Sequence, residues 1–197
     1  MSRVLVATTN PGKVVEYQAI LSDAGIQLLG LHEAGVDFEV GESGQTFEEN
    51  ARMKARVYAD ESGLLTLADD SGLCVDALGG GPGILSARYG PDPASRIKRL
   101  LSEMAEVPDD GRTARFVCVI ALAAPGGETH TFEGLCEGRI ARHPKGTRGF
   151  GYDPVFYLPE YDQTMAELPP FLKNEISHRA RAAARLKAWL AGRLPHA

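Results

Sequence analysis

The N-terminal stretch VLVATTNPGKVVEYQAIL, residues 4–21, predicts a β-strand, a tight loop and an α-helix in immediate succession. Residues 4–7 form a short β-prone run. Asn10 before Pro11 predicts a helix start, because Asn is a favoured N-cap and the missing proline N–H costs nothing at the first helical position. Apolar side chains then recur at helical spacing, and Gly25 predicts the end of this helix.

Helices and strands continue to alternate along the rest of the chain. The expected elements are a helix with a capping box at Thr46–Glu49, a strand over 64–68 followed by a break at 69–72, a helix starting at Asp92-Pro93, a hairpin of residues 116–123 and 129–140, and a last helix over 177–191. Helices interleaved with strands, together with one long hairpin, predict an α/β fold with a mixed, curved central sheet and helices on its faces.

Composition excludes several classes of protein. The 197 residues are enough for one domain or two tightly fused lobes, and 44% hydrophobic with 24% charged residues exclude a disordered chain. A net charge of −5 argues against a general basic surface for a nucleic acid polymer. The apolar runs are too short for a membrane span, and the N-terminus does not resemble a signal peptide, so we expect a cytoplasmic protein. Three separated cysteines without a CxxC spacing predict buried thiols.

Two segments near the expected strand ends could bind phosphate or metal. The loop Asn10–Lys13 would present unpaired backbone N–H groups, a helix N-terminus and one lysine charge, but a capped helix with a surface lysine fits the same residues. Asp69-Asp70-Ser71-Gly72 would suit a divalent cation, and an Asx-type turn is the equal alternative. Glu42 in a glycine-flanked loop could add a carboxylate, although a solvated side chain is commoner, and the same holds for Lys54.

Two segments in the second half of the chain could bind the remainder of a ligand. Residues 149–154, GFGYDP, allow unusual backbone geometry and an aromatic stack on a base, or else bury Phe150 and Tyr152 in the core. Residues 173–179, KNEISHR, place basic groups at the expected start of the last helix, where the helix dipole disfavours cations. An anionic or carbonyl-bearing ligand would remove that conflict.

Taken in order, these segments resemble the family of pyrophosphatases for non-standard purine nucleoside triphosphates, the inosine/xanthosine triphosphate pyrophosphatases. The matching motifs lie between residues 8 and 179, and they are TTNPGK (8–13), TFEENA (46–51), ADDSGL (68–73), LGGGPG (78–83), SARY (86–89), GFGYDP (149–154), AEL (166–168) and KNEISHR (173–179). Each tetrapeptide is a weak signal, whereas the ordered set is specific.

The resemblance implies magnesium-dependent hydrolysis of ITP, dITP and XTP to the monophosphate and pyrophosphate. It also implies a single catalytic domain over 1–197 with an elongated sheet, two lobes with the active-site cleft between them, and a homodimer. By the same resemblance, Asp70 is the catalytic carboxylate and binds Mg²⁺ together with Glu42. The substrate-binding residues would be Thr8, Thr9, Asn10, Pro11, Gly12, Lys13, Lys54 and Ser71 on the phosphates, and Phe150, Gly151, Tyr152, Asp153, Lys173, His178 and Arg179 around the base, with Arg88 as a weaker candidate.

The hypothetical reaction is attack on the α-phosphorus by a water that the metal and Asp70 activate. It requires the acidic residues around Asp70 and the loop ending at Lys13 to lie together. Two alternatives remain at this point: a nucleotide sensor without catalysis, and a pyrophosphatase for pyrimidine or modified nucleotides.

Overall fold

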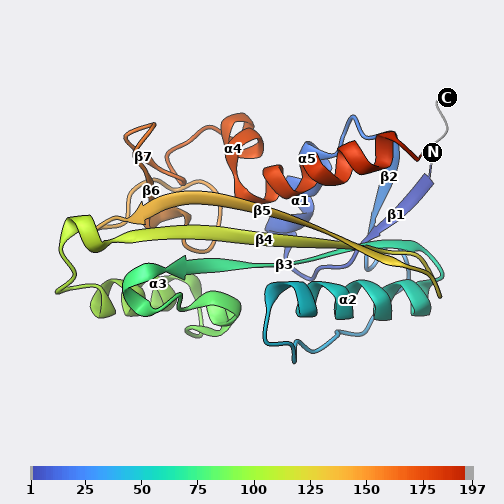
Figure 1. The fold of residues 1–197 in the computed structure, drawn as a ribbon, viewed down its shortest axis with the longest axis horizontal. Helices are drawn as coiled ribbons and strands as arrows, with labels where there is room; N and C mark the ends of the chain where they lie inside the picture. The colour runs from blue at the N-terminus through green and yellow to red at the C-terminus, as the bar shows by residue number, and fades with distance from the viewer. Residues whose placement is uncertain (1, 194–197) are drawn as a thin grey trace. The chain divides into compact units, whose positions relative to one another are not determined.

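A mixed sheet of seven strands, with helices on both of its faces, organises residues 2–193, which the computed structural model describes (Figure 1). The strand order is β2-β1-β3-β4-β5-β6-β7. The strands are β1 (Ser2–Val6), β2 (Ile26–Gly30), β3 (Leu65–Val75), β4 (Thr113–Ala123), β5 (Thr129–Ile140), β6 (Phe156–Leu158) and β7 (Gln163–Thr164). Strand β1 is parallel to β2 and β3, whereas β6 is antiparallel to β5 and β7, which confirms the predicted mixed α/β fold.

The helices begin where the sequence places their caps. They are α1 (Pro11–Ile20), α2 (Phe47–Ser62), α3 (Pro93–Glu103), α4 (Pro170–Ile176) and α5 (His178–Ala191). The predicted N-caps Asn10, Thr46 and Asp92 each accept a hydrogen bond from a backbone N–H of the helix that follows. The carboxylate of Glu49 accepts from the N–H of Gln45, one residue before the N-cap that a capping box would use.

The chain divides into two compact units, and β3, β4 and β5 contribute residues to both. Unit 1 comprises the chain up to Asp70, Cys118–Gly134 and the residues from Arg179 on; unit 2 comprises Ser71–Val117 and Leu135–His178.

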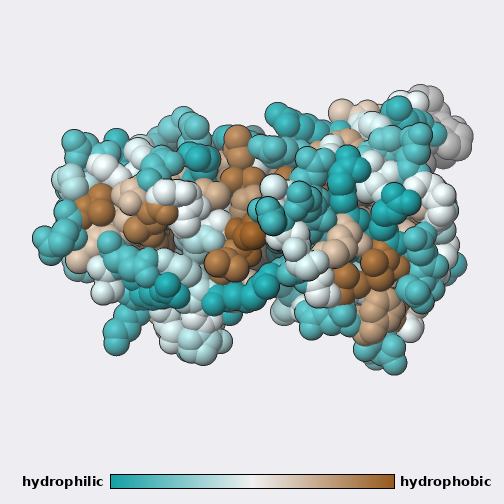
Figure 2. All heavy atoms as spheres, turned by 60° about the horizontal axis from the view of Figure 1, so that its bottom comes forward, coloured by the Kyte–Doolittle hydropathy of each residue, from teal (hydrophilic) through white to brown (hydrophobic). Residues whose placement is uncertain are grey.

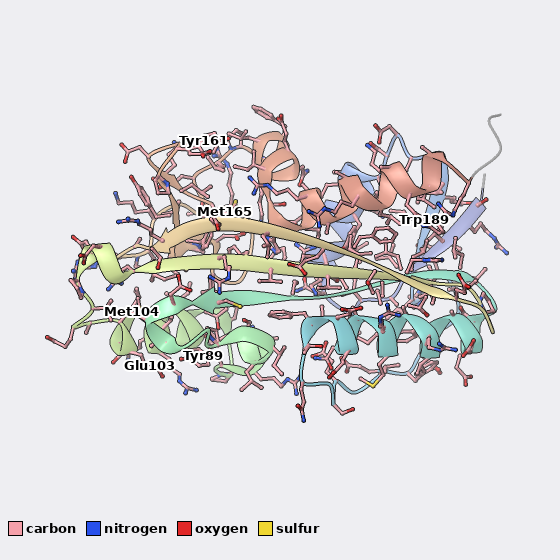
Figure 3. The ribbon with its side chains drawn as sticks, viewed as in Figure 1. Tyr89, Glu103, Met104, Tyr161, Met165 and Trp189 are labelled. Carbon is pink, nitrogen blue, oxygen red and sulfur yellow. The ribbon has the colours of Figure 1, made fainter. Side chains whose placement is uncertain are left out.

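Unit 1 has a hydrophobic cluster on each face of the sheet. Because successive side chains of a strand point to opposite faces, Val4 and Val6 pack with α1 and α5, while Leu5 packs with α2. Trp189 of α5, labelled in Figure 3, contacts the ring of Phe132 on β5.

Unit 2 has its own cluster, in which Phe156, Met104 and Met165 are fully buried (Figure 3). Beside it lies Arg112, a buried arginine whose guanidinium donates to backbone carbonyls instead of a carboxylate. Its Nε binds the carbonyl oxygen of Ile140 at 2.7 Å, and its Nη1 binds that of Met104, the C-cap of α3, at 2.6 Å. Arg112 thus ties the end of α3 to the end of β5.

Replacement of Arg112 by Ala is expected to lower the free energy of unfolding by about 2–4 kcal/mol, because several buried carbonyls lose their donors at once. Chemical denaturation measures the loss. Arg142→Ala is the matched control, since its ion pair with Asp109 is exposed and contributes under about 1 kcal/mol. Equal losses in the two variants would contradict this function of Arg112.

Two predicted boundaries are wrong. Helix α1 ends at Ile20 with Leu21 as C-cap, and Gly25 forms a later turn with φ +68°. Strand β3 continues through residues 69–72 without a break, so Asp69 and Asp70 lie inside a strand and form no Asx turn. This continuity is possible because buried cationic and amide groups bind both carboxylates.

The predicted last helix over 177–191 is confirmed as α5, and a separate short helix, α4, comes directly before it. The backbone of Ser177 is extended, with ψ 160°, and its N–H bonds to the carbonyl of Lys173 to close α4. Lys173 therefore lies in the last turn of α4, where a cation is favourable for the helix dipole. The expected electrostatic conflict remains only at the start of α5, with His178 and Arg179.

On the face drawn in Figure 2, hydrophobic side chains form separate patches among hydrophilic ones. Large hydrophobic side chains that are exposed in the described chain are Val15, Phe38, Val57, Leu85, Leu135 and Phe171. Within residues 2–193, no helix has the length and apolar character that a membrane span requires.

Candidate active site

The loop before α1 is held by its own side chains. Asn10 Oδ1 accepts from the N–H groups of Gly12 at 2.9 Å and Lys13 at 3.4 Å, and Thr8 Oγ1 accepts from the N–H of Asn10 at 3.2 Å. The expectation of unpaired N–H groups at residues 12 and 13 is therefore wrong, because the N-cap binds both. The ammonium group of Lys13 supplies the cationic charge of this loop.

Lys13 and Asp69 bring the loop and strand β3 together. The Lys13 Nζ lies 3.0 Å from Asp69 Oδ2, and the Asp69 side chain is fully buried. Burial opposes ionisation of Asp69, but the charges of Lys13 and Arg179 outweigh it and hold the pKa of Asp69 well below its usual value. This ion pair places the loop beside Asp69 of β3, as predicted; a cleft between the loop and the acids of β3 stays a prediction.

Arg179 forms further ion pairs with Asp69 and Glu16. Its guanidinium is buried, with Nη2 3.2 Å from Asp69 Oδ2 and Nη1 hydrogen-bonded to the carboxylate of Glu16. Lys13, Asp69, Arg179 and Glu16 thus form a chain of alternating charges within unit 1. This differs from the predicted setting of Arg179 beside a base; a contact with a base stays a prediction.

The second carboxylate of β3 has a different set of neighbours, because adjacent residues of a strand point to opposite faces. Asn50 Nδ2 donates to Asp70 Oδ2 at 2.9 Å, and Lys54 Nζ lies 4.0 Å from Asp70 Oδ1. The same ammonium group lies 2.6 Å from Glu42 Oε1. Three predicted residues, Glu42, Lys54 and Asp70, therefore form one group in unit 1, with Lys54 between the two carboxylates.

Burial of Asp70 favours a carboxyl that takes up a proton more readily than usual. Burial raises its pKa, Lys54 opposes the rise, and the neighbouring carboxylate of Glu42 adds to it. Burial also disfavours the charged form of Lys54, but the surrounding carboxylates outweigh this and raise its pKa. Asp70 is therefore easier to protonate than an ordinary aspartate, whereas Asp69 is harder to protonate.

The chemistry of Asp70 and Glu42 fits a magnesium site. Mg²⁺ in phosphate-binding sites uses one or two protein carboxylates together with phosphate oxygens and water. The mutual repulsion of Asp70 and Glu42 is what a divalent cation would relieve. No group of three or more His, Cys, Asp or Glu side chains suited to a metal occurs in the part of the chain that the structure describes. Asp70 and Glu42 would supply the protein carboxylates of such a magnesium site.

The predicted base-binding motif of unit 2 is built around Asp153. Its Oδ2 accepts from the N–H of Phe150 at 2.8 Å and from Lys173 Nζ, which also lies 4.8 Å from the centroid of the Phe150 ring. Gly149 has φ +75°, and a Cβ there would collide with Asp153 Oδ2. Asp153 therefore fixes both the lysine and the backbone that carries the aromatic ring.

The remaining predicted site residues differ in their burial and in their contacts. Tyr152 is buried and donates to the carbonyl of Ser86 at 2.9 Å, and burial raises its pKa to about 12, so it is part of the core as the alternative prediction had it. His178 is buried and stacks on Phe116 with centroids 4.7 Å apart. Ser71 is the first residue of unit 2, and Arg88 is exposed in the 3₁₀ turn Gly83–Arg88.

Sequence reasoning missed four residues of these groups: Glu16, Asn50, Phe116 and Cys118, whose Sγ lies 3.7 Å from Asp69 Oδ2. It named Asp69 within a candidate cation site but gave it no role of its own. Asp69 had the signal of an unusual Asp-Asp pair, and Asn50 lies within the TFEENA motif. The others have no local signal, because their partners are distant in sequence.

Comparison with known proteins identifies the family. The sequence profile of the Ham1 family matches residues 4–189. The chain belongs to the Ham1 family. This confirms the resemblance on which the site assignments depend, since the ordered motifs lie within the matched range.

Relatives of this Ham1 protein share about half of its residues. The dITP/XTP pyrophosphatase of Geobacter sulfurreducens is 53% identical, over 96% of this chain and 97% of that protein. The dITP/XTP pyrophosphatase of Bacillus licheniformis is 49% identical, over 96% of this chain and 98% of that protein. A HAM1 protein from Coxiella burnetii has a similar solved structure, with a TM-score of 0.88, 42% identity, and coverage of 98% of this chain and all of that chain (100%).

Proposed function

We propose that this Ham1 protein hydrolyses ITP, dITP and XTP to the nucleoside monophosphate and pyrophosphate, and so removes deaminated purines from the nucleotide pool. The observation that carries the proposal is the near full-length match to relatives named dITP/XTP pyrophosphatase. The charged groups of unit 1 support the same chemistry. The proposal also includes a homodimer, which the resemblance implies, and a cytoplasmic location, which the sequence led us to expect.

In the proposed reaction, Asp70 takes a proton from the water that attacks the α-phosphorus. The raised pKa of Asp70 supports this, because a general base works best when its pKa approaches the working pH. Lys13 and Lys54 stabilise the negative charge of the phosphates and of the departing pyrophosphate. Asp69 keeps Lys13 in place through their ion pair.

The proposed cofactor is Mg²⁺, held by Asp70 and Glu42 together with substrate phosphates. When bound, it supplies positive charge that neutralises the phosphates and makes water more acidic. The contact of Lys54 with Glu42 keeps the Glu42 carboxylate near Asp70 in the protein alone.

For the base, we propose recognition by Phe150, Lys173 and His178 of unit 2. Hypoxanthine and xanthine carry a 6-oxo acceptor, whereas adenine has an amino donor there. Donors on basic side chains pair with the 6-oxo group of hypoxanthine and xanthine, but they would have no partner opposite the amino group of adenine. Such a mismatch can lower kcat/KM for the wrong substrate by about 10⁴-fold. Ring stacking by Phe150 adds affinity without selecting among purines.

One assay tests the proposal: release of pyrophosphate with Mg²⁺ from ITP, dITP, XTP, GTP, ATP and pyrimidine triphosphates. We expect kcat/KM for ITP and XTP to exceed that for ATP by at least about 10³-fold, on the pairing argument above. A preference for pyrimidines would establish the alternative pyrophosphatase. Tight binding of ITP without release from any nucleotide would establish a sensor. Omission of Mg²⁺ should abolish release, and full activity in EDTA would contradict the proposed cofactor.

A further inference from the structure

We infer that Asn50 is a positioning residue that fixes the carboxyl group of Asp70 and joins it to the loop that carries Glu42. This inference rests on the proposed function and goes beyond it, because Asn50 belongs to neither the predicted catalytic residues nor the predicted ligands. Asn50 lies in the first turn of α2 and its exposed fraction is 1%.

The two ends of the Asn50 amide have partners of opposite kind. Its Oδ1 accepts from the backbone N–H of Gly44 at 2.8 Å, and its Nδ2 donates to Asp70 Oδ2 at 2.9 Å. A backbone N–H can only donate and a carboxylate can only accept. The orientation of the amide is therefore determined by these partners, and a carboxylate or a hydrocarbon side chain could not satisfy both.

The loop that contains Gly44 lies in close contact with the Asn50 side chain. A Cβ on Gly44 would come within 2.7 Å of Asn50 Oδ1 and 2.8 Å of Glu49 Cβ. Only glycine lets the backbone approach the amide this closely. The same loop carries Glu42, whose carboxylate is 2.6 Å from Lys54 Nζ. One side chain thus couples three elements: β3, α2 and the loop before α2.

For the reaction, this arrangement fixes the rotation of the Asp70 carboxyl. If the carboxyl plane of a general base rotates freely, many of its conformations do not point toward the attacking water. Small misplacements of catalytic groups lower the rate by up to about 100-fold. Because both ends of the Asn50 amide are already bonded within the protein, to Asp70 and Gly44, its loss should change the chemical step and leave substrate affinity nearly unchanged.

Two variants of Asn50 distinguish the effects of its hydrogen bonds to Gly44 and to Asp70. Asn50→Asp is isosteric and keeps an oxygen for Gly44, but it places a second carboxyl against Asp70. Asn50→Ala removes both bonds and adds no charge. At saturating Mg²⁺ we expect kcat for ITP to fall at least about tenfold in both variants, with KM within about twofold of the parent protein. Glu48→Gln, an exposed change on the same first turn of α2, is the control and should retain full kcat.

Hydrogen exchange of the Gly44 amide gives a readout that does not depend on catalysis. We expect its protection to persist in Asn50→Asp and to be lost in Asn50→Ala, while the rest of α2 stays protected in both. Unchanged kcat in both variants, or a rise in KM with unchanged kcat, would overturn the inference. If the parent protein releases no pyrophosphate, the proposed function fails, and protection of Gly44 then still reports whether Asn50 joins the loop to α2.

Discussion

Replacement of Asp70 by Asn is expected to lower kcat for ITP by about 10²- to 10⁴-fold, the contribution of a positioned general base. Asn has the shape of Asp but cannot take up the proton of the attacking water. The buried Asn50 amide would face an amide in place of a carboxylate, and a partner oxygen remains available to it. We therefore expect the variant to fold. Initial rates of pyrophosphate release together with a thermal melt measure both parts.

Asp60→Asn is the control for this experiment. Asp60 is an exposed residue of the same helix as Lys54, and its Oδ1 accepts from the N–H of Gly126, which an Asn oxygen can also do. The kcat of the Asp60→Asn variant should equal that of the parent protein. Turnover near the parent rate in Asp70→Asn would remove Asp70 from the proposed reaction.

Replacement of Asp69 by Asn is expected to have the largest effect on stability, a loss of about 3–5 kcal/mol in the free energy of unfolding. Asp69 is the anion between Lys13 and Arg179, and the guanidinium of Arg179 is buried. Without the carboxylate, these cations face each other with less compensation. Urea denaturation at neutral pH measures the loss, and activity should fall too because Lys13 loses its anchor.

The effect of Asp69 depends on pH in a definite direction. Its pKa is depressed in the folded protein relative to the usual 3.8, so the carboxylate stabilises the fold fully above that value. Its contribution is lost as pH falls from there toward the lower folded pKa. The difference in unfolding free energy between the parent and Asp69→Asn should therefore be constant at neutral pH and shrink as pH falls below about 3.8.

Asp23→Asn is the matched control for Asp69→Asn. Asp23 pairs with Lys187 at the surface, where its side chain is 70% exposed, so its replacement should leave the free energy of unfolding nearly unchanged. Similar losses in the two variants would show that Asp69 is not the centre of the buried ion pairs.

Much of the fold follows from local sequence signals. Asn10, Thr46 and Asp92 are strong N-caps whose partners lie within three residues, and the turn at Gly126 joins two long β-prone runs. The prediction errors arose where tertiary contacts, rather than the local sequence, determine the secondary structure. Asp-Asp-Ser-Gly favours a turn locally, yet the ion pair of Asp69 and the amide bond of Asp70 keep this segment in a strand.

The site was predictable where a motif carries the residue and unpredictable where packing places it. Glu42, Lys54 and Asp70 were named through the resemblance, and the structure brings them together. The pairing of Arg179 with Glu16 and Asp69 joins residues more than a hundred positions apart, so no spacing rule reveals it. Asn50 was hidden for another reason, since Asn in the first turn of a helix is ordinary.

The uninterrupted run of β3 through Asp69 and Asp70 has a consequence for how this protein tolerates change. Deletion or insertion of a single amino acid upstream in that strand would turn each aspartate toward the layer that now holds the other one. Asp70, the proposed proton acceptor, would then meet the lysine and arginine, and Asp69 would meet the amide. The two acids are thus not interchangeable copies, and neither could stand in for the other after such a shift.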